Sequence, residues 1–312
     1  MVRKLTCGRK NRKEQTNKAK RANVGRPPKT LHPKQIKKYN EERKVIVKSL
    51  YRIIKKHTGA IGGNGSGGPI YGELTEGWMH TAIYYFIKYT YLSKKSRWID
   101  VGCGVGKPSL HVAQYPGVEF AFGIEIDKLR TDIGHINVKH VLKEAKNNPK
   151  MAHNCILQYG DVLKAESFDP FTHIYMYDVG FDPETMIGIA ERFNNSSTAK
   201  YFISYKRPNE IINDYKFEVK LIFDFQTKMT GSGEGHQCYI FYRTSKPGIG
   251  ATRRFHPSGV PCDKLFLEAW DTVKSEGFEG VKKHVGEKVD DFYDSTTKRV
   301  CKPPDRYHDS YH

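Results

Sequence analysis

The pattern of apolar and polar positions predicts alternating strands and helices from Arg97 onward. Short apolar runs, each followed by turn residues, are separated by segments with helical periodicity. The last two runs instead alternate apolar and polar residues, as an antiparallel pair does. This order of elements predicts an α/β fold with a doubly wound, seven-stranded sheet whose last strand is antiparallel. The predicted strands lie in RWIDVG, VEFAFGIEID, NCILQYGDVL, THIYMYDVGF, AKYFISYK, KFEVKLIFDFQTK and GHQCYIFYR.

Helices flank this region on both sides. Residues 33–57 have the periodicity of a basic amphipathic helix, and a glycine-rich connector follows them. An aromatic-rich helix is predicted at 78–91, and the segment DKLFLEAWDTVKSEG near the C-terminus has the spacing of one more. The apolar side of the first helix is predicted to consist of Ile36, Tyr39, Val45, Leu50 and Ile53.

These patterns divide the chain into four predicted parts. Residues 1–32 are a basic arm that is too polar and too highly charged to fold by itself. Residues 33–68 comprise the basic helix and its glycine-rich connector, and residues 69–243 form the α/β domain. Residues 244–312 are rich in polar residues, Gly, Pro and His, and form a C-terminal appendage whose role the sequence does not define.

The positive charge is concentrated near the N-terminus. The formal net charge is +18, and residues 1–56 contain 20 Lys and Arg against 3 Asp and Glu. Such clustering indicates a polyanionic partner, DNA or a nucleosome, bound through phosphate contacts. A solubilising tail or a localisation signal has the same composition. The segment NVGRPPKT resembles an AT-hook, in which an arginine enters the minor groove, and a plain basic linker is the alternative.

Other classes of protein are disfavoured by what the sequence lacks. It contains no apolar run of about 18 residues, the length of a membrane span. Its N-terminus lacks the apolar region of a secretory signal. The 6 cysteines are scattered, which disfavours a zinc module and a disulfide framework and favours a reducing compartment. The histidines show no ligand spacing, so no metal site is expected.

The candidate chemistry begins at the end of the first predicted strand, in WIDVGCGVGKPSL. Gly102, Gly104 and Gly106 alternate with other residues after Asp100. A glycine-rich turn between a strand and a helix brings backbone N–H groups and a helix N-terminus close to a ligand. The dinucleotide fingerprint G-x-G-x-x-G is absent, which disfavours a nicotinamide cofactor.

Two further acids indicate which ligand the turn accepts. Glu125 ends the second predicted strand, where an acid binds ribose hydroxyls, and Asp161 follows the third strand, within reach of an adenine amino group. An acid at the end of each of three successive strands is typical of S-adenosylmethionine (SAM) methyltransferases. Because SAM carries a sulfonium cation, Asp100 is expected to supply complementary charge near its aminoacyl end. A purely structural turn is the alternative.

Four segments in this order resemble the Dot-one (disruptor of telomeric silencing) family of histone lysine methyltransferases: YGELTEGW, DVGCGVGKP, GIEID and YMYDVGFDPE. The resemblance covers residues 65–245. It implies a class I SAM-dependent methyltransferase fold, SAM as the cofactor, and a lysine of histone H3 on the nucleosome core face as the substrate. Together with the charge of the N-terminal arm, it leads us to expect a nuclear, monomeric protein that contacts DNA through this arm and does not associate with membranes.

The resemblance further implies which residues form the site. Phe181 and Tyr239 match aromatic residues of the lysine channel, and Asp178 replaces an asparagine beside it. Tyr177 is expected to line the same channel. If the register of the late strand differs, Cys238 or Gln237 takes the place of Tyr239. The residues expected to bind SAM are Tyr71, Gly72, Glu73, Thr75, Asp100, Gly102, Gly104, Gly106, Lys107, Glu125, Asp161 and Val162.

The sequence also departs from the family pattern. Lys107 replaces a glutamine and is expected to point at the SAM carboxylate, and Val162 replaces an aromatic residue that stacks on adenine. A carboxylate at Asp178 would raise the pKa of a substrate amine, so we assign it to SAM placement or amine orientation. The alternatives are a structural hydrogen bond for Asp178, a loop brace for Glu73 and a core aromatic for Tyr239.

The sequence thus predicts a SAM-dependent histone lysine N-methyltransferase. An RNA methyltransferase is the first alternative, since a basic arm also suits RNA, but the NPPY-type motif of amino-group nucleic-acid methylases is absent. The second alternative is a catalytically inactive chromatin-binding module, which the intact Asp100, Glu125 and Asp161 disfavour.

Overall fold

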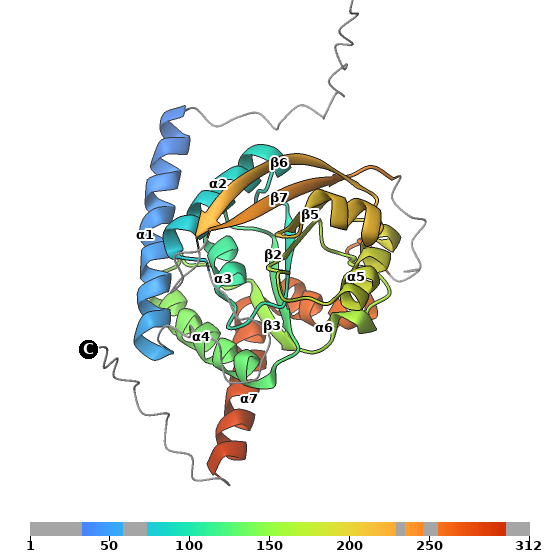
Figure 1. Cartoon of the computed structure of the whole chain (residues 1–312). Coiled ribbons are helices and arrows are strands. Elements are labelled where there is room, and N and C mark those ends of the chain that lie inside the picture. The colour runs from blue at the N-terminus through green and yellow to red at the C-terminus, as the bar shows by residue number, and fades with distance from the viewer. Residues whose placement is uncertain (1–32, 59–73, 229–234, 246–254, 298–312) are drawn as a thin grey trace, which may run out of the picture.

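The computed structural model describes residues 33–58, 74–228, 235–245 and 255–297. In this part of the chain seven strands form one sheet, in the order β3-β2-β1-β4-β5-β7-β6 (Figure 1). Strands β1 to β5 are parallel, and β7 runs antiparallel to both of its neighbours. The predicted doubly wound sheet with an antiparallel last strand is therefore confirmed. The strands are β1 (Arg97–Val101), β2 (Phe120–Glu125), β3 (Cys155–Tyr159), β4 (His173–Met176), β5 (Tyr201–Ser204), β6 (Val219–Lys228) and β7 (Gly235–Arg243).

Helices cover both faces of this sheet. Several lie close to the predicted positions, and none in the described ranges is long and apolar enough to cross a membrane. The helices are α1 (Pro33–His57), α2 (Glu76–Thr90), α3 (Lys107–Gln114), α4 (Lys128–Asn147), α5 (Pro183–Asn195), α6 (Lys264–Asp271) and α7 (Gly277–Thr297), with short helical turns at Val162–Lys164, Glu210–Asp214 and Thr272–Glu276.

Side-chain caps fix where two of these helices begin. Asp127 Oδ1 accepts a hydrogen bond of 3.1 Å from the Arg130 amide at the start of α4. Asp182 Oδ1 accepts one of 2.8 Å from the Thr185 amide at the start of α5, and Pro183 occupies the first helical position, where no amide is needed. Helix α4 begins three residues after the end of β2 and α5 seven residues after the end of β4, so their N-termini follow the carboxyl ends of parallel strands.

Helix α1 packs against α3 and α4 rather than standing apart from the α/β domain (Figure 1). Its buried residues are Ile46, Val47, Leu50 and Ile54. The prediction that Val45 belongs to the apolar side was wrong, because Val45 is 68% exposed. The buried stripe is rotated away from Val45. Residues 46, 47, 50 and 54 follow helical periodicity at least as well as the predicted set does.

The C-terminal region also contributes to the core. Phe266 and Trp270 on α6 are fully buried. The Trp270 ring lies 5.2 Å from the Phe120 ring, and the Phe266 ring lies 5.0 Å from the Phe171 ring. The expected appendage at 244–312 therefore includes a helix that packs on the sheet. Its aromatic residues had the right spacing for this, but their partners are far away in sequence.

A histidine anchors the central strand β4 to α2. His173 Nε2 lies 3.1 Å from Thr90 Oγ1, and its Nδ1 lies 2.8 Å from Thr172 Oγ1. The ring stacks on Tyr201 at 4.9 Å. Burial lowers the pKa of His173 to about 3, so the ring is neutral in the folded chain.

We expect His173→Gln to weaken the pH dependence of stability. The unfolded chain protonates this imidazole below about pH 6.5, whereas the folded chain keeps it neutral. The stability that depends on the neutral ring is thus complete above pH 6.5 and is lost as the pH falls toward 3. Between pH 7 and pH 5, the wild type should lose about 2 kcal/mol more unfolding free energy than the variant. Urea denaturation at the two pH values measures this, and equal losses would contradict it.

Candidate functional site

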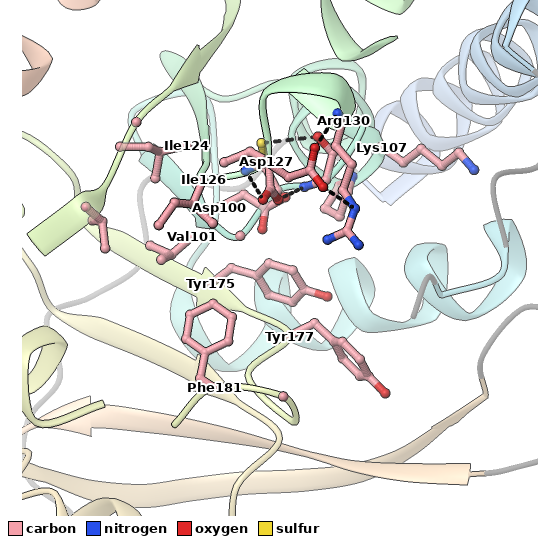
Figure 2. A pocket seen from close by; sticks show the side chains of 18 of the residues that line it. Asp100, Val101, Lys107, Ile124, Ile126, Asp127, Arg130, Tyr175, Tyr177 and Phe181 are labelled. Carbon is pink, nitrogen blue, oxygen red and sulfur yellow. Dashed lines mark hydrogen bonds and ion pairs between the residues drawn. The ribbon is translucent and has the colours of Figure 1, made fainter. Parts of the chain in front are cut away.

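A cavity of 660 Å³ lies at the carboxyl ends of β1, β2, β3 and β4 (Figure 2). The sheet order places β1 beside both β2 and β4, so the chain reverses its winding direction here. Open α/β sheets bind ligands at such a switch point, outside the strand ends. The volume is in the range of small-molecule and cofactor sites.

The glycine turn forms one wall of this cavity. Gly102, Gly104 and Gly106 have φ values of 74°, 55° and 81°, in the left-handed region that favours glycine. A Cβ atom on Gly106 would lie 2.4 Å from Leu157 Cδ1, so no larger residue fits beneath the turn. At Gly102 it would lie 2.9 Å from Phe181 Cζ. The turn keeps its backbone close to the cavity and to β4.

Asp100 is the acid of the turn, and it is buried in the wall of the cavity with 1% of its surface exposed. Its Oδ2 atom has no hydrogen-bond partner among the described residues. Burial, and then the charge of Glu125, raises the pKa of Asp100 well above its usual value. An unpartnered buried carboxylate oxygen facing a cavity suits a cationic ligand, because such a ligand would supply the missing partner.

Glu125 braces the glycine turn from the end of β2. Its Oε2 accepts a 2.7 Å hydrogen bond from the Gly104 amide, and its Oε1 accepts one of 2.9 Å from the Asp127 amide. A carboxylate oxygen can accept more than one hydrogen bond, so the expected ribose contact remains compatible with this geometry. Arg130 stands at the same rim, with its Nε 3.5 Å from Asp127 Oδ2 (Figure 2).

Asp161 and Val162 form the part of the wall that follows β3. Asp161 Oδ1 accepts a 2.8 Å hydrogen bond from the Leu163 amide and so caps the short helical turn that follows. Val162 is buried with 6% exposed. An acid beside an apolar surface is the arrangement expected around an adenine ring. The roles of Asp161 and Val162 in adenine binding stay predictions.

Lys107 lines the cavity as the first residue of α3. In Figure 2 its side chain extends away from Asp100. Its expected contact with the SAM carboxylate stays a prediction. Thr75 does not line the cavity. Its hydroxyl instead caps α2 by accepting a 3.3 Å hydrogen bond from the Trp78 amide. Tyr71, Gly72 and Glu73 lie outside the described residues.

Asp178 lies away from the cavity, contrary to the role that we expected for it. The residue is fully buried and its carboxylate faces β5. Its Oδ2 accepts a hydrogen bond from the Ser204 hydroxyl, and its Oδ1 accepts one of 2.7 Å from the Tyr205 amide. Burial raises the pKa of Asp178 to about 6. The structural alternative therefore describes its geometry better.

Among the described residues, β7 contributes none to the cavity wall and meets the site through a contact with the lining residue Tyr177. Tyr239 does not line the cavity, and its ring lies 6.4 Å from that of Phe241 on the same strand. Cys238 is buried between the sheet and its covering layer. His236 instead contacts Tyr177 edge to face, at 5.7 Å between ring centroids. The alternation along β7 puts His236 and Cys238 on one face and Tyr239 on the other.

Several lining residues were not among the predicted site residues. Tyr175 on β4 stands beside Phe181 and the expected channel residue Tyr177 in the cavity (Figure 2). Tyr51 reaches the cavity from α1, and its hydroxyl lies 3.1 Å from His111 Nδ1 on α3. The alternation of β4 could have indicated Tyr175. Nothing in the sequence pattern could have placed Tyr51, since its helix meets the site only through tertiary packing.

The described residues fit SAM but show no metal centre. Within these ranges, no group of three or more His, Cys, Asp and Glu side chains is placed to hold a metal ion. The glycine turn, the unpartnered oxygen of Asp100 and the acids at the ends of β2 and β3 suit a ligand with a cationic aminoacyl end and a nucleoside end. The fold and this site define a class I SAM-dependent methyltransferase.

The family follows from a sequence comparison. Residues 65–228 match the model of the family described as histone methylation protein DOT1, which is more than half of the chain, so the chain belongs to this family. The matched residues include the glycine turn and the ends of β1 to β5. No curated protein matches the chain significantly.

Solved methyltransferases are similar at low identity. A candidate RNA methyltransferase from Pyrococcus horikoshii is 14% identical with a TM-score of 0.44, and the match covers 66% of this chain and 100% of that chain. Magnesium protoporphyrin IX methyltransferase from Synechocystis PCC 6803, solved with bound SAM, is 14% identical with a TM-score of 0.39, covering 70% of this chain and 100% of that chain. Similarities this distant do not indicate a substrate.

We expect Asp100→Asn to weaken SAM binding without destabilising the ligand-free protein. The carboxylate that would meet the cofactor cation is lost, which should raise the Kd for SAM about 10- to 100-fold. Without ligand, the substitution removes a charge whose burial is unfavourable. Calorimetric titration and thermal unfolding measure the two effects. Unchanged affinity, or a large loss of ligand-free stability, would show that Asp100 has a structural role instead.

We expect substitutions of Asp178 to affect stability rather than cofactor binding. Asp178→Ala leaves the buried Ser204 hydroxyl and Tyr205 amide without their acceptor and should cost about 2 to 4 kcal/mol of unfolding free energy. Asp178→Asn keeps an acceptor and should preserve most of the stability and the turnover number. A stable Asp178→Asn variant with strongly reduced turnover would instead support direct action on the substrate amine.

Proposed function

We propose that the chain is a histone lysine N-methyltransferase that acts on a lysine of histone H3 within the nucleosome. The observation that carries this proposal is the DOT1 family match over residues 65–228, which spans the cavity and its glycine turn. A nuclear location and DNA contact through residues 1–32 are parts of the same proposal. They are supported by the positive charge of the N-terminal region.

The cofactor would be bound by the strand ends. Asp100 would face the cationic aminoacyl end, Glu125 the ribose, and Asp161 with Val162 the adenine. When bound, SAM supplies an electrophilic methyl group on its sulfonium sulfur. Because Glu125 also holds the Gly104 amide, ribose binding and the shape of the turn depend on one carboxylate.

The acceptor lysine would enter along the aromatic side of the cavity. Tyr177 and Phe181 line this side, and Tyr177 is held edge to face by Tyr205 at 4.8 Å and by His236 at 5.7 Å. A lysine side chain has a pKa near 10.4 in water, and only its neutral amine attacks. Aromatic walls remove water from the amine and so lower its pKa. They would also hold the amine in line with the methyl group.

Because Asp178 points toward β5, its carboxylate does not oppose this deprotonation. A carboxylate facing the amine would stabilise the ammonium form and raise its pKa. The Ser204 and Tyr205 hydrogen bonds hold the Asp178 carboxyl group against the end of β5. We therefore propose Phe181 as a channel residue and no longer assign a direct role to Asp178 or Tyr239.

Methyl transfer from tritiated SAM to three substrates tests the proposal. The full chain is incubated in parallel with nucleosomes, free histones and RNA, and labelled protein is hydrolysed to identify the methylated amino acid. We expect label in methyl-lysine of histone H3, and more of it from nucleosomes than from free histones. Label in RNA, label on another amino acid, or no label in any substrate would contradict the proposal.

The matched control for this assay is Gly104→Arg. Gly104 lines the cavity at a φ of 55°, so an arginine there is strained and adds a large side chain to the cavity wall. The variant should show no label above background and should remain folded, as near-ultraviolet circular dichroism can verify. Label retained in this variant would mean that the signal comes from a contaminating enzyme.

A further inference from the structure

The outward face of α1 carries a row of positive charges. Lys44, Lys48, Arg52 and Lys55 are exposed and follow one another at helical spacings of four and three residues. At 1.5 Å per residue the row extends about 17 Å along the helix. Lys44 pairs with Glu41 at 3.2 Å, whereas Lys48, Arg52 and Lys55 form no ion pair with any residue that the structure describes.

The same helix is fixed firmly to the methyltransferase core. The ring of His57 stacks on that of His140 on α4 at 3.3 Å, and Thr58 Oγ1 donates a 2.7 Å hydrogen bond to Asn137 Oδ1. At its other end, the Arg43 guanidinium donates a 3.1 Å hydrogen bond to the Lys150 carbonyl oxygen. Helices α1 and α4 therefore lie antiparallel, and the charged row is part of the folded surface.

Helix α4 extends the positive surface beside this row. Lys143 is exposed on α4, and its charge is close enough to act on both rings of the His57–His140 stack, as does that of Lys56. We define the α1–α4 basic surface as Lys48, Arg52, Lys55, Lys56 and Lys143. It is separate from the cavity, to which residues 41–57 of α1 contribute Tyr51.

The charged row is unfavourable for the helix by itself. Like charges four residues apart on a helix repel one another. The apolar residues on the opposite face, Leu50 and Ile54 among them, keep the helix in place. Lys48, Arg52 and Lys55, which form no ion pair with a described residue, are complementary to a regular line of anions, which would remove the repulsion and release counterions.

Two other anionic partners fit the surface less well. A membrane surface needs an apolar face to insert, and Val45 is the one exposed large apolar side chain among residues 41–58. Single-stranded nucleic acid is bound by stacking on exposed aromatic rings. In residues 41–58 the aromatic rings are those of Tyr51, which is partly buried against His111, and of His57, one face of which is covered by the His140 ring. The straight, rigid row favours a duplex backbone.

We propose that the α1–α4 basic surface binds the phosphate backbone of duplex DNA. The proposal rests on the proposed function in that DNA is the polyanion that a nucleosomal substrate carries. Because Tyr51 on the same helix lines the cofactor cavity, DNA bound to this surface has a fixed position relative to the methyl-transfer site. Contact through residues 1–32 would add affinity, while α1 would set the orientation.

The salt dependence of DNA binding tests this proposal in the full-length chain. The test variant combines Lys48→Gln, Arg52→Gln and Lys55→Gln. The matched control combines Lys95→Gln, Lys220→Gln and Lys264→Gln, three exposed lysines on other elements with the same change in charge. The Kd for a short DNA duplex is measured by fluorescence anisotropy from about 50 to 200 mM salt, the range in which phosphate contacts dominate.

We expect the slope of log K against log salt concentration to become shallower by about 3 in the test variant, since each phosphate contact contributes about 0.9. The control should keep the wild-type slope. Equal changes in both variants, or no change in either, would overturn the proposal. The proposal would also be overturned if the test variant kept the wild-type slope for DNA but lost binding to phosphatidylserine vesicles or to single-stranded RNA. The surface would then serve that partner.

Methyl transfer separates this proposal from the proposed function. The test variant should methylate free histones at the wild-type rate and nucleosomes at least several-fold more slowly. An equal loss on both substrates would overturn the positioning role of the surface. If neither wild type nor variant methylates histones, the proposed function fails, but the change in salt slope still decides whether the surface binds DNA.

Discussion

The site depends on two carboxylates held at the ends of neighbouring parallel strands. Glu125 satisfies its charge with the Gly104 and Asp127 amides, whereas one buried oxygen of Asp100 has no hydrogen-bond partner in the described part of the chain. Burying an incompletely paired carboxylate is unfavourable, and the raised pKa of Asp100 expresses this. A cationic ligand relieves the cost, so cofactor binding and the stability of the folded chain are linked. The glycine turn allows the ligand to come close enough to the Asp100 carboxylate.

The core that supports this arrangement comes from the whole described chain. On one face, Trp98 and Tyr175 stack at 5.1 Å beneath the cavity, and on the other the α6 residues Phe266 and Trp270 pack on the strands. Helix α1 covers α3, whose first residues form part of the cavity wall. Residues outside the family match therefore complete the core, since without α6 the aromatic face of β2 would be exposed to water.

Much of the fold could be predicted because the relevant signals are local. Apolar runs that end in Asp100, Glu125 or near Asp161 mark strand ends, and parallel strands bring those ends to one edge of the sheet. The environment of Tyr239 could not be predicted this way. Alternation shows which residues of β7 share a face, but which face meets the cavity depends on the insertion of β7 between β5 and β6. Periodicity likewise left the buried stripe of α1 undetermined, and Val45 was misplaced.

The placement of Asp178 resolves an electrostatic conflict that the sequence had raised. A carboxylate among the channel aromatics would have favoured the ammonium form of a substrate lysine. In the structure the same residue ties the end of β4 to that of β5 through Ser204 and Tyr205. Tyr205 in turn packs edge to face against Tyr177, which lines the cavity. Asp178 is thus joined to the cavity wall through Tyr205 and Tyr177, while its own carboxyl group does not line the cavity.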